Sequence, residues 1–157
     1  MADLAEDRLE YASLAAPKYP ACCQLVDLWR SHHDKGGLVM GRDIPSRAFA
    51  RLLRSIMVLE PLDAGRDFRV RLAGSGLRRR WDREITGLTL SEIFGPASLP
   101  AQLELTRRVL ATGGPVLQWG TNFVSGVARD RREIALLPIL SPDQQKPWVL
   151  AGVFYID

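Results

Sequence analysis

The amino-acid sequence predicts an α+β fold in which helices pack on one face of a five-stranded antiparallel sheet. Segments of helical period occupy 21–34 and 98–112, and a strand of clean apolar–polar alternation lies between them at 68–72. Three strand-like segments separated by short turns close the chain, which favours an antiparallel meander. The length of 157 residues suits one domain.

Residues 1–20 show no clear period and are interrupted by prolines, so we expect an N-terminal arm there. A single domain is expected over 21–157, beginning with a leading helix at 21–34. Because the apolar stripe of this helix is narrow, the helix must dock on the outer face of its own sheet or on a second copy of the chain. The stripe consists of Cys22, Leu25, Val26, Trp29 and His33.

A hairpin and several short helices are expected in the middle of the chain. A buried strand at 56–59 pairs with the alternating strand at 68–72. A capping-box pattern at 89–92 starts a short helix, and a longer helix begins near Ser98. The last of the closing strands is apolar at nearly every position, which is typical of a central strand covered on both faces. The closing strands are expected at 116–124, 133–140 and 148–156.

Three segments resemble the PAS domain family, and more narrowly its short, stand-alone bacterial members. They are LVDLWRSH followed by GRDIPSRAFARLL, the stretch DFRVRLAGSGLRRRWDREITGLTLSEIF, and the closing pair REIALLPIL and WVLAGVFYID. The resemblance covers roughly residues 21–156. It implies a sheet with the strand order 2-1-5-4-3. It also implies that a ligand, where a member binds one, lies between one sheet face and the helices that close over it.

A pocket of aromatic and small polar side chains is expected at that place. Strand alternation puts Leu117, Trp119, Thr121 and Phe123 on one face of the strand at 116–124. A filled aromatic core explains the same pattern, so the sequence leaves open whether a ligand exists. The candidate ligand-binding residues are Ser75, Trp81, Phe94, Leu103, Thr106, Trp119, Thr121 and Asn122.

The stretch LAGSGLRRRW at 72–81 suggests two other functions. Its glycines match neither spacing of the phosphate-binding loops and no lysine follows them, so a strand-to-helix turn is the favoured interpretation. The three arginines at 78–80 could contact the phosphates of a nucleic acid. A solvated helix face explains such a run more often, and the net charge is only +3. Nucleic-acid binding therefore ranks third among the functions considered.

The cofactor patterns of the family are missing from the sequence. The long helix at 98–112 has no histidine of the kind that holds haem in PAS sensors, and no cysteine for flavin photochemistry follows Cys23. We expect neither a His-ligated haem nor a cysteinyl flavin. His32 and His33 share one helix end, so we expect no metal site, no catalytic constellation and no enzymatic activity.

The expected function is sensory. A small molecule in the pocket would signal through a protein partner or a homodimer, with Leu25, Val26 and Trp29 of the leading helix at the interface. A ligand-free protein-interaction module is the alternative. The charged first residues and the lack of a long apolar run favour a cytoplasmic protein that does not contact a membrane.

Overall fold

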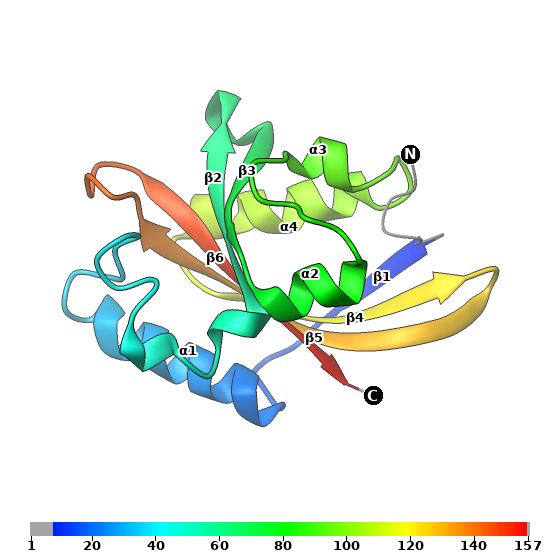
Figure 1. Ribbon diagram of the computed structural model, residues 1–157, viewed down its shortest axis with the longest axis horizontal. Helices are drawn as coiled ribbons and strands as arrows, with labels where there is room; N and C mark the ends of the chain where they lie inside the picture. Colours follow the sequence, from blue (N-terminus) through cyan, green and yellow to red (C-terminus); the bar gives the residue numbers. More distant parts are fainter. Residues whose placement is uncertain (1–7, 157) are drawn as a thin grey trace.

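A six-stranded sheet forms the centre of the computed structural model, which describes residues 8–156 (Figure 1). The strands lie in the order β1-β4-β5-β6-β2-β3, and neighbours are antiparallel throughout. The strand bounds are β1 Arg8–Ser13, β2 Ile56–Leu62, β3 Asp67–Ala73, β4 Val116–Val124, β5 Val127–Leu140 and β6 Pro147–Ile156.

Strand β1 corrects the predicted sheet. The prediction of five strands in the order 2-1-5-4-3 is wrong for the sheet as a whole, because β1 pairs with β4 along one edge. The strands β2 to β6 keep the predicted neighbours when β1 is set aside. Part of the arm expected at 1–20 is therefore a strand, while residues 1–7 lie outside the described part of the chain. Only Leu9 is buried in β1, which is too weak a pattern to reveal a strand in the sequence.

The helices agree well with the sequence. The leading helix, the long helix and the short helix after the capping box are confirmed. In that capping box the Thr89 hydroxyl accepts a hydrogen bond from the Glu92 backbone N–H, and the Glu92 carboxylate accepts one from the Thr89 N–H at 3.0 Å. The α-helices are α1 Pro20–His33, α2 Ser75–Trp81, α3 Leu90–Ile93 and α4 Leu99–Thr112, and short 3-10 helices lie at Arg47–Phe49, Leu53–Ser55 and Asp63–Gly65.

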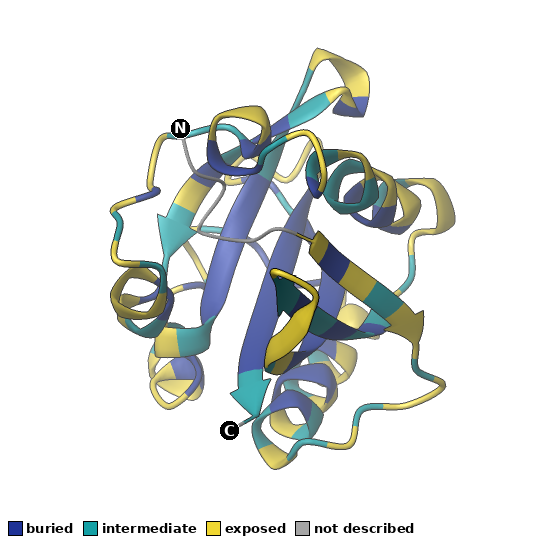
Figure 2. Ribbon diagram, turned by 90° about the vertical axis from the view of Figure 1, so that its right-hand side faces the viewer, coloured by how far each residue is buried: buried dark blue, intermediate teal, exposed yellow. Residues whose placement is uncertain are grey.

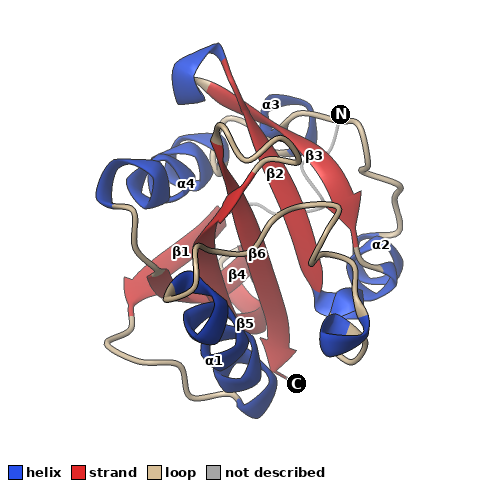
Figure 3. Ribbon diagram, turned by 90° about the vertical axis from the view of Figure 1, so that its left-hand side faces the viewer, coloured by secondary structure: helices blue, strands red, loops and turns tan. Residues whose placement is uncertain are grey.

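Both faces of the sheet are covered. Helices α2, α3 and α4 lie over one face, here called the inner face, and α1 lies over the outer face against β5 and β6 (Figure 3). Figure 2 shows the central strands as the most deeply buried part of the chain. On β6, Ala151 and Val153 belong to the inner core, whereas Leu150 and Phe154 belong to the outer core. The prediction that the last strand is central and covered on both faces is confirmed.

Hydrogen bonds hold helix α1 on the outer face near both of its ends. At the start, the buried carboxylate of Glu133 on β5 accepts hydrogen bonds from the backbone N–H groups of Lys18 and Tyr19, at 2.8 and 2.9 Å. In its third turn, the indole N–H of Trp29 donates to the carbonyl oxygen of Pro138 at 2.7 Å. These bonds join the helix to one strand at two separate points.

The middle of α1 lies unusually close to the sheet. A Cβ atom at Gly152 of β6 would lie 2.4 Å from Leu25 Cδ2, so any larger residue there would require the Leu25 side chain to move. Leu25, Val26 and Trp29, the candidate interface residues, are buried against this outer face within the same chain. Two docking surfaces were possible for this helix from its sequence, and the structure shows the first of them, the outer face of its own sheet. A role for them in a dimer remains a prediction.

We expect Trp29→Ala to lower the free energy of unfolding by about 3–5 kcal/mol, because it removes a buried aromatic side chain and one hydrogen bond to the sheet. Urea denaturation followed by circular dichroism measures the change. Asp27→Ala, an exposed position on the same helix, is the matched control and should change stability little. Equal stability of the two variants would contradict the packing of α1 on the sheet.

We expect Glu133→Ala to lower the free energy of unfolding by about 1–3 kcal/mol, since two backbone N–H groups lose their acceptor. Glu133→Gln keeps one acceptor oxygen and should lose less. Hydrogen exchange at the Lys18 and Tyr19 amides provides the local measurement. Unchanged protection of both amides in Glu133→Ala would show that the carboxylate does not hold the helix start.

Candidate functional site

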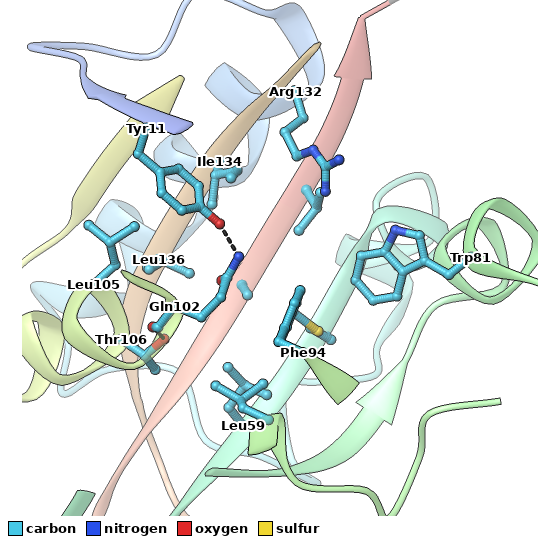
Figure 4. Close-up of a pocket in the computed structure, with 14 residues that line it drawn as sticks. Tyr11, Leu59, Trp81, Phe94, Gln102, Leu105, Thr106, Arg132, Ile134 and Leu136 are labelled. Atoms are coloured by element: carbon cyan, nitrogen blue, oxygen red, sulfur yellow. Dashed lines mark hydrogen bonds between the residues drawn. The ribbon is translucent and has the colours of Figure 1, made fainter. Parts of the chain in front are cut away.

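A small cavity lies between the inner face of the sheet and helices α3 and α4 (Figure 4). Its volume is about 30 Å³, which is the space of a single water molecule. Most of its wall is apolar. The lining residues are Tyr11, Met57, Leu59, Trp81, Leu90, Phe94, Gln102, Leu105, Thr106, Arg132, Ile134, Leu136, Ala151 and Val153.

Four polar side chains from three elements converge on this apolar space. Tyr11 comes from β1, Gln102 and Thr106 from α4, and Arg132 from β5. The Gln102 side-chain amide donates to the Tyr11 hydroxyl, as Figure 4 shows. The Thr106 hydroxyl donates to the Gln102 carbonyl oxygen at 2.7 Å and so turns its own polar atom back onto the helix. The side-chain amide of Gln102 is thus the polar group that α4 presents beside the cavity.

Arg132 brings a buried positive charge to the other polar side of the cavity. Its side chain is only 3% exposed, and its guanidinium pairs with Asp130 at 2.8 Å. The same guanidinium lies 4.6 Å from the centre of the Tyr155 ring, a cation–π contact. Asp130 also accepts from the Asn122 side-chain amide at 3.4 Å. Burial of this charge is therefore compensated by a carboxylate and an aromatic ring.

Trp81 at the end of α2 forms the wall opposite Tyr11 in Figure 4. Its indole N–H donates to the Tyr155 hydroxyl, which fixes the ring against β6. The guanidinium of Arg80 lies 4.1 Å from the centre of the same tyrosine ring. Tyr11, Trp81 and Gln102 are each only half-buried, so these walls separate the cavity from solvent.

The structure brings together some of the candidate ligand-binding residues and separates others. Trp81, Phe94 and Thr106 line the cavity. Leu103 is half-buried against the inner core but does not line the cavity. Ser75 is exposed at the first turn of α2. The helices were the reliable part of the prediction, because their apolar stripes fix which side chains face the sheet.

The predicted face of β4 is wrong. A Cβ at Gly120 would contact the side chains of Tyr11 and Arg132, which places even-numbered positions of β4 on the inner face. Trp119 and Thr121 therefore point to the outer face, where Leu117 packs against the outer core. The same alternation directs Phe123 outward, while Asn122 points inward but hydrogen-bonds Asp130 and does not line the cavity.

Sequence reasoning missed Tyr11, Gln102 and Arg132. Tyr11 lies in the segment for which the sequence predicts an N-terminal arm. The spacing of Gln102 and Thr106, one helical turn apart, was the available signal for a polar face on α4. Arg132 precedes the strand predicted at 133–140 and stands in a run of charged residues at 129–133, so its inward direction could not be separated from that of its neighbours.

The Gly74–Gly76 turn serves packing in this structure. A Cβ at Gly74 would lie 2.1 Å from the Leu53 carbonyl oxygen, so the glycine allows two backbone segments to touch. Nearby, the Thr86 backbone N–H and the Arg78 guanidinium, which donates to Glu84 at 2.9 Å, lower the pKa of Glu84 to about 2. Part of the arginine run is therefore engaged within the chain.

The cysteines and histidines lie on α1, away from the cavity. Burial raises the pKa of the Cys22 thiol well above its ordinary value, and the neighbouring Glu133 carboxylate raises it further. The His33 ring stacks on Trp29 with ring centres 4.5 Å apart. Among residues 8–156, no group of three or more His, Cys, Asp or Glu side chains could hold a metal ion.

We expect the Cys22 thiol to resist iodoacetamide at pH 8 in the folded protein, because the thiolate is the reacting form and burial disfavours it. Peptide mapping before and after unfolding in urea separates Cys22 from Cys23. Since the pKa is raised by folding, the protonated thiol favours the native state below the ordinary value of 9.0, and this contribution declines above that pH. Rapid native labelling of Cys22 would contradict its burial.

The comparisons with known proteins agree with this architecture. The model of the PAS domain family matches residues 18–154, a span that contains α1 to α4 and strands β2 to β5 whole. No curated protein is similar enough to the chain to count as a match. None of the helices described in 8–156 is long and apolar enough to cross a membrane. Strand β1 precedes the matched residues, and the chain belongs to the PAS domain family.

Proposed function

We propose that the protein is a cytoplasmic, non-enzymatic sensory module that binds a small molecule at the inner-face cavity. The bound state would be passed on to a protein partner or to a second copy of the chain. The observation that carries this proposal is the meeting of Tyr11, Gln102 and Arg132 around a space in an otherwise apolar core. A core needs no such groups for packing, whereas a ligand site uses a few polar groups to orient its occupant.

The cavity must enlarge to admit a metabolite, because about 30 Å³ is far below the volume of an ordinary ligand site. Its floor consists of central strands that are buried on both faces. Its walls include the half-buried side chains of Tyr11 and Trp81, each positioned by a hydrogen bond to another side chain. Entry of a ligand through these two walls leaves the central sheet intact.

Strand β6 offers a short route from the cavity to α1. Ala151 and Val153 line the cavity, and Gly152 between them touches Leu25 of α1 on the opposite face. A ligand that shifts this part of β6 would change the packing of the helix by the same displacement. Ligand binding would then favour one arrangement of α1 over another, which a partner could detect.

A ligand-free interaction module is the second candidate, and the small volume of the cavity favours it. In that case the inner core is simply packed, and the surface of α1 or of the sheet edge carries the function. The two candidate functions make different predictions: only the sensory module should carry a bound small molecule when the protein is purified from its own host.

We expect native mass spectrometry of the protein from its own host to show an added mass that disappears on denaturation. Ala151→Met extends a side chain into the cavity and should abolish the added mass. Val127→Met places the same side chain on the exposed β4–β5 hairpin and should retain it. The same spectra give the subunit count. A bare mass for the wild type would favour the interaction module.

A further inference from the structure

Tyr11 lies in the inner-face site although it comes from outside the residues that match the family. Its ring points between Leu105 and Ile134 toward Gln102 (Figure 4). The ring and the amide are brought together by the pairing of β1 with β4, which sets Tyr11 directly opposite Gly120. An aromatic side chain from an added edge strand thus forms one wall of the cavity.

Gly120 provides the space for this ring. A Cβ there would lie 3.4 Å from Tyr11 Cε1, 3.3 Å from Ile134 Cδ1 and 3.1 Å from Arg132 Cγ. Glycine weakens a strand interior and is typical of a place where another group approaches closely. The absence of a side chain at this point of β4 leaves a flat surface on which an aromatic ring can lie.

The contacts of Tyr11 describe the chemistry of the site that it fills. Leu105 and Ile134 are apolar neighbours, and the Gln102 amide donates to the phenolic oxygen at the far end of the ring. If the Tyr11 ring moved out, its space would join the present cavity, because Tyr11 is part of the cavity wall. The combined space would be apolar over most of its wall and suited to a flat ring, with the Gln102 amide as the hydrogen-bond donor at the position of the Tyr11 hydroxyl.

We propose that the site takes a small aromatic compound with a phenolic hydroxyl, and that Tyr11 is an occupant from the same chain which this ligand displaces. The inference rests on the proposed function as a ligand sensor and names the class of ligand. The ligand ring lies on Gly120, and its hydroxyl replaces that of Tyr11 as the acceptor for the Gln102 amide.

Strand β1 is suited to release of this kind. It is an edge strand paired only with β4, and Leu9 is its one buried residue. Elements with few buried contacts open locally at low free-energy cost. Because Tyr11 is in the middle of β1, removal of its ring from the site loosens the strand. Ligand binding is thereby coupled to the freedom of the chain that leads into α1.

The test uses p-cresol, which is the tyrosine side chain as a free molecule, and toluene, which lacks its hydroxyl. We expect full-length Tyr11→Ala to bind p-cresol about tenfold more tightly than the wild type, measured by calorimetry, because the competing occupant is gone. Tyr11→Ala should prefer p-cresol to toluene by about fivefold, the effect of one hydrogen bond. Equal affinity of wild type and Tyr11→Ala for p-cresol overturns the inference.

Two matched variants separate the site from a general loosening of β1. Glu10→Ala, an exposed neighbour on the same strand, should bind p-cresol as the wild type does. Gln102→Leu combined with Tyr11→Ala should lose the preference for p-cresol over toluene. A preference that survives in this double variant overturns the assigned role of Gln102.

Hydrogen exchange of the wild type tests displacement without any substitution. Saturating p-cresol should speed exchange at the β1 amides that pair with β4 and slow it on α4, whereas unchanged protection of β1 overturns the displacement. If Tyr11→Ala does not fold, Tyr11→Phe replaces it, and it should bind p-cresol severalfold more tightly than the wild type. An added mass in host-purified protein without p-cresol binding to either variant overturns the phenolic ligand and leaves the proposed function standing.

Discussion

The fold depends on one constraint, which is that strand β6 is apolar on both of its faces. Its residues from Trp148 to Phe154 are all buried, and β5 and β2 hydrogen-bond to its two edges. A strand of this kind cannot face water on either side, so the sheet needs a cover above and below. Helices α2 to α4 provide the inner cover and α1 provides the outer one. The position of the cavity follows, because it lies where the inner cover meets the strand.

The same constraint brings the inner and outer helices into contact with the same strand, β6. Along β6, successive side chains belong to opposite cores, so an inner contact and an outer contact are one residue apart. At Gly152 the distance between the two covers is shorter still, because this residue has no side chain and Leu25 of α1 touches the strand backbone there. A sheet of ordinary composition, solvated on its outer face, would offer no such link. The outer helix is thus both a requirement of the hydrophobic core and the element best placed to respond to the cavity.

Much of the fold could be predicted because its signals are local. The stripe of α1, the capping box at Thr89 and the continuous apolar run of β6 each follow from residues within one turn or one strand. The helical stripes likewise directed Trp81, Phe94 and Thr106 toward the sheet, and all three line the cavity. The face of β4 could not be predicted, because Leu117 and Trp119 make the outer face apolar, whereas the inner face carries Gln118, Gly120 and Asn122 after Val116.

The remaining errors share a physical origin in β1. The inner positions 118, 120 and 122 of β4 carry polar residues and glycine, and the neighbouring strand β1 supplies an aromatic side chain, Tyr11, opposite Gly120. The contact of Tyr11 with Gln102 joins residues far apart in the chain, and no periodicity encodes it. A six-residue strand with one buried side chain is too weak a pattern to be recognised before its partner is known.

The elements that bound the cavity differ in how easily they open locally, and this difference bears on how a ligand would act. Its floor consists of β2, β5 and β6. Each of these strands is hydrogen-bonded to a neighbour along both edges, and each contributes side chains to both the inner and the outer core. Its sides are an edge strand and the end of the short helix α2, where half-buried side chains close the space. A ligand that enters from the sides alters the contacts of β1 and α2 first, because those contacts cost least to break. Helix α1 packs directly on this floor and is hydrogen-bonded to β5 at two separate points, so under the proposed function a displacement of the floor would move the helix as a unit.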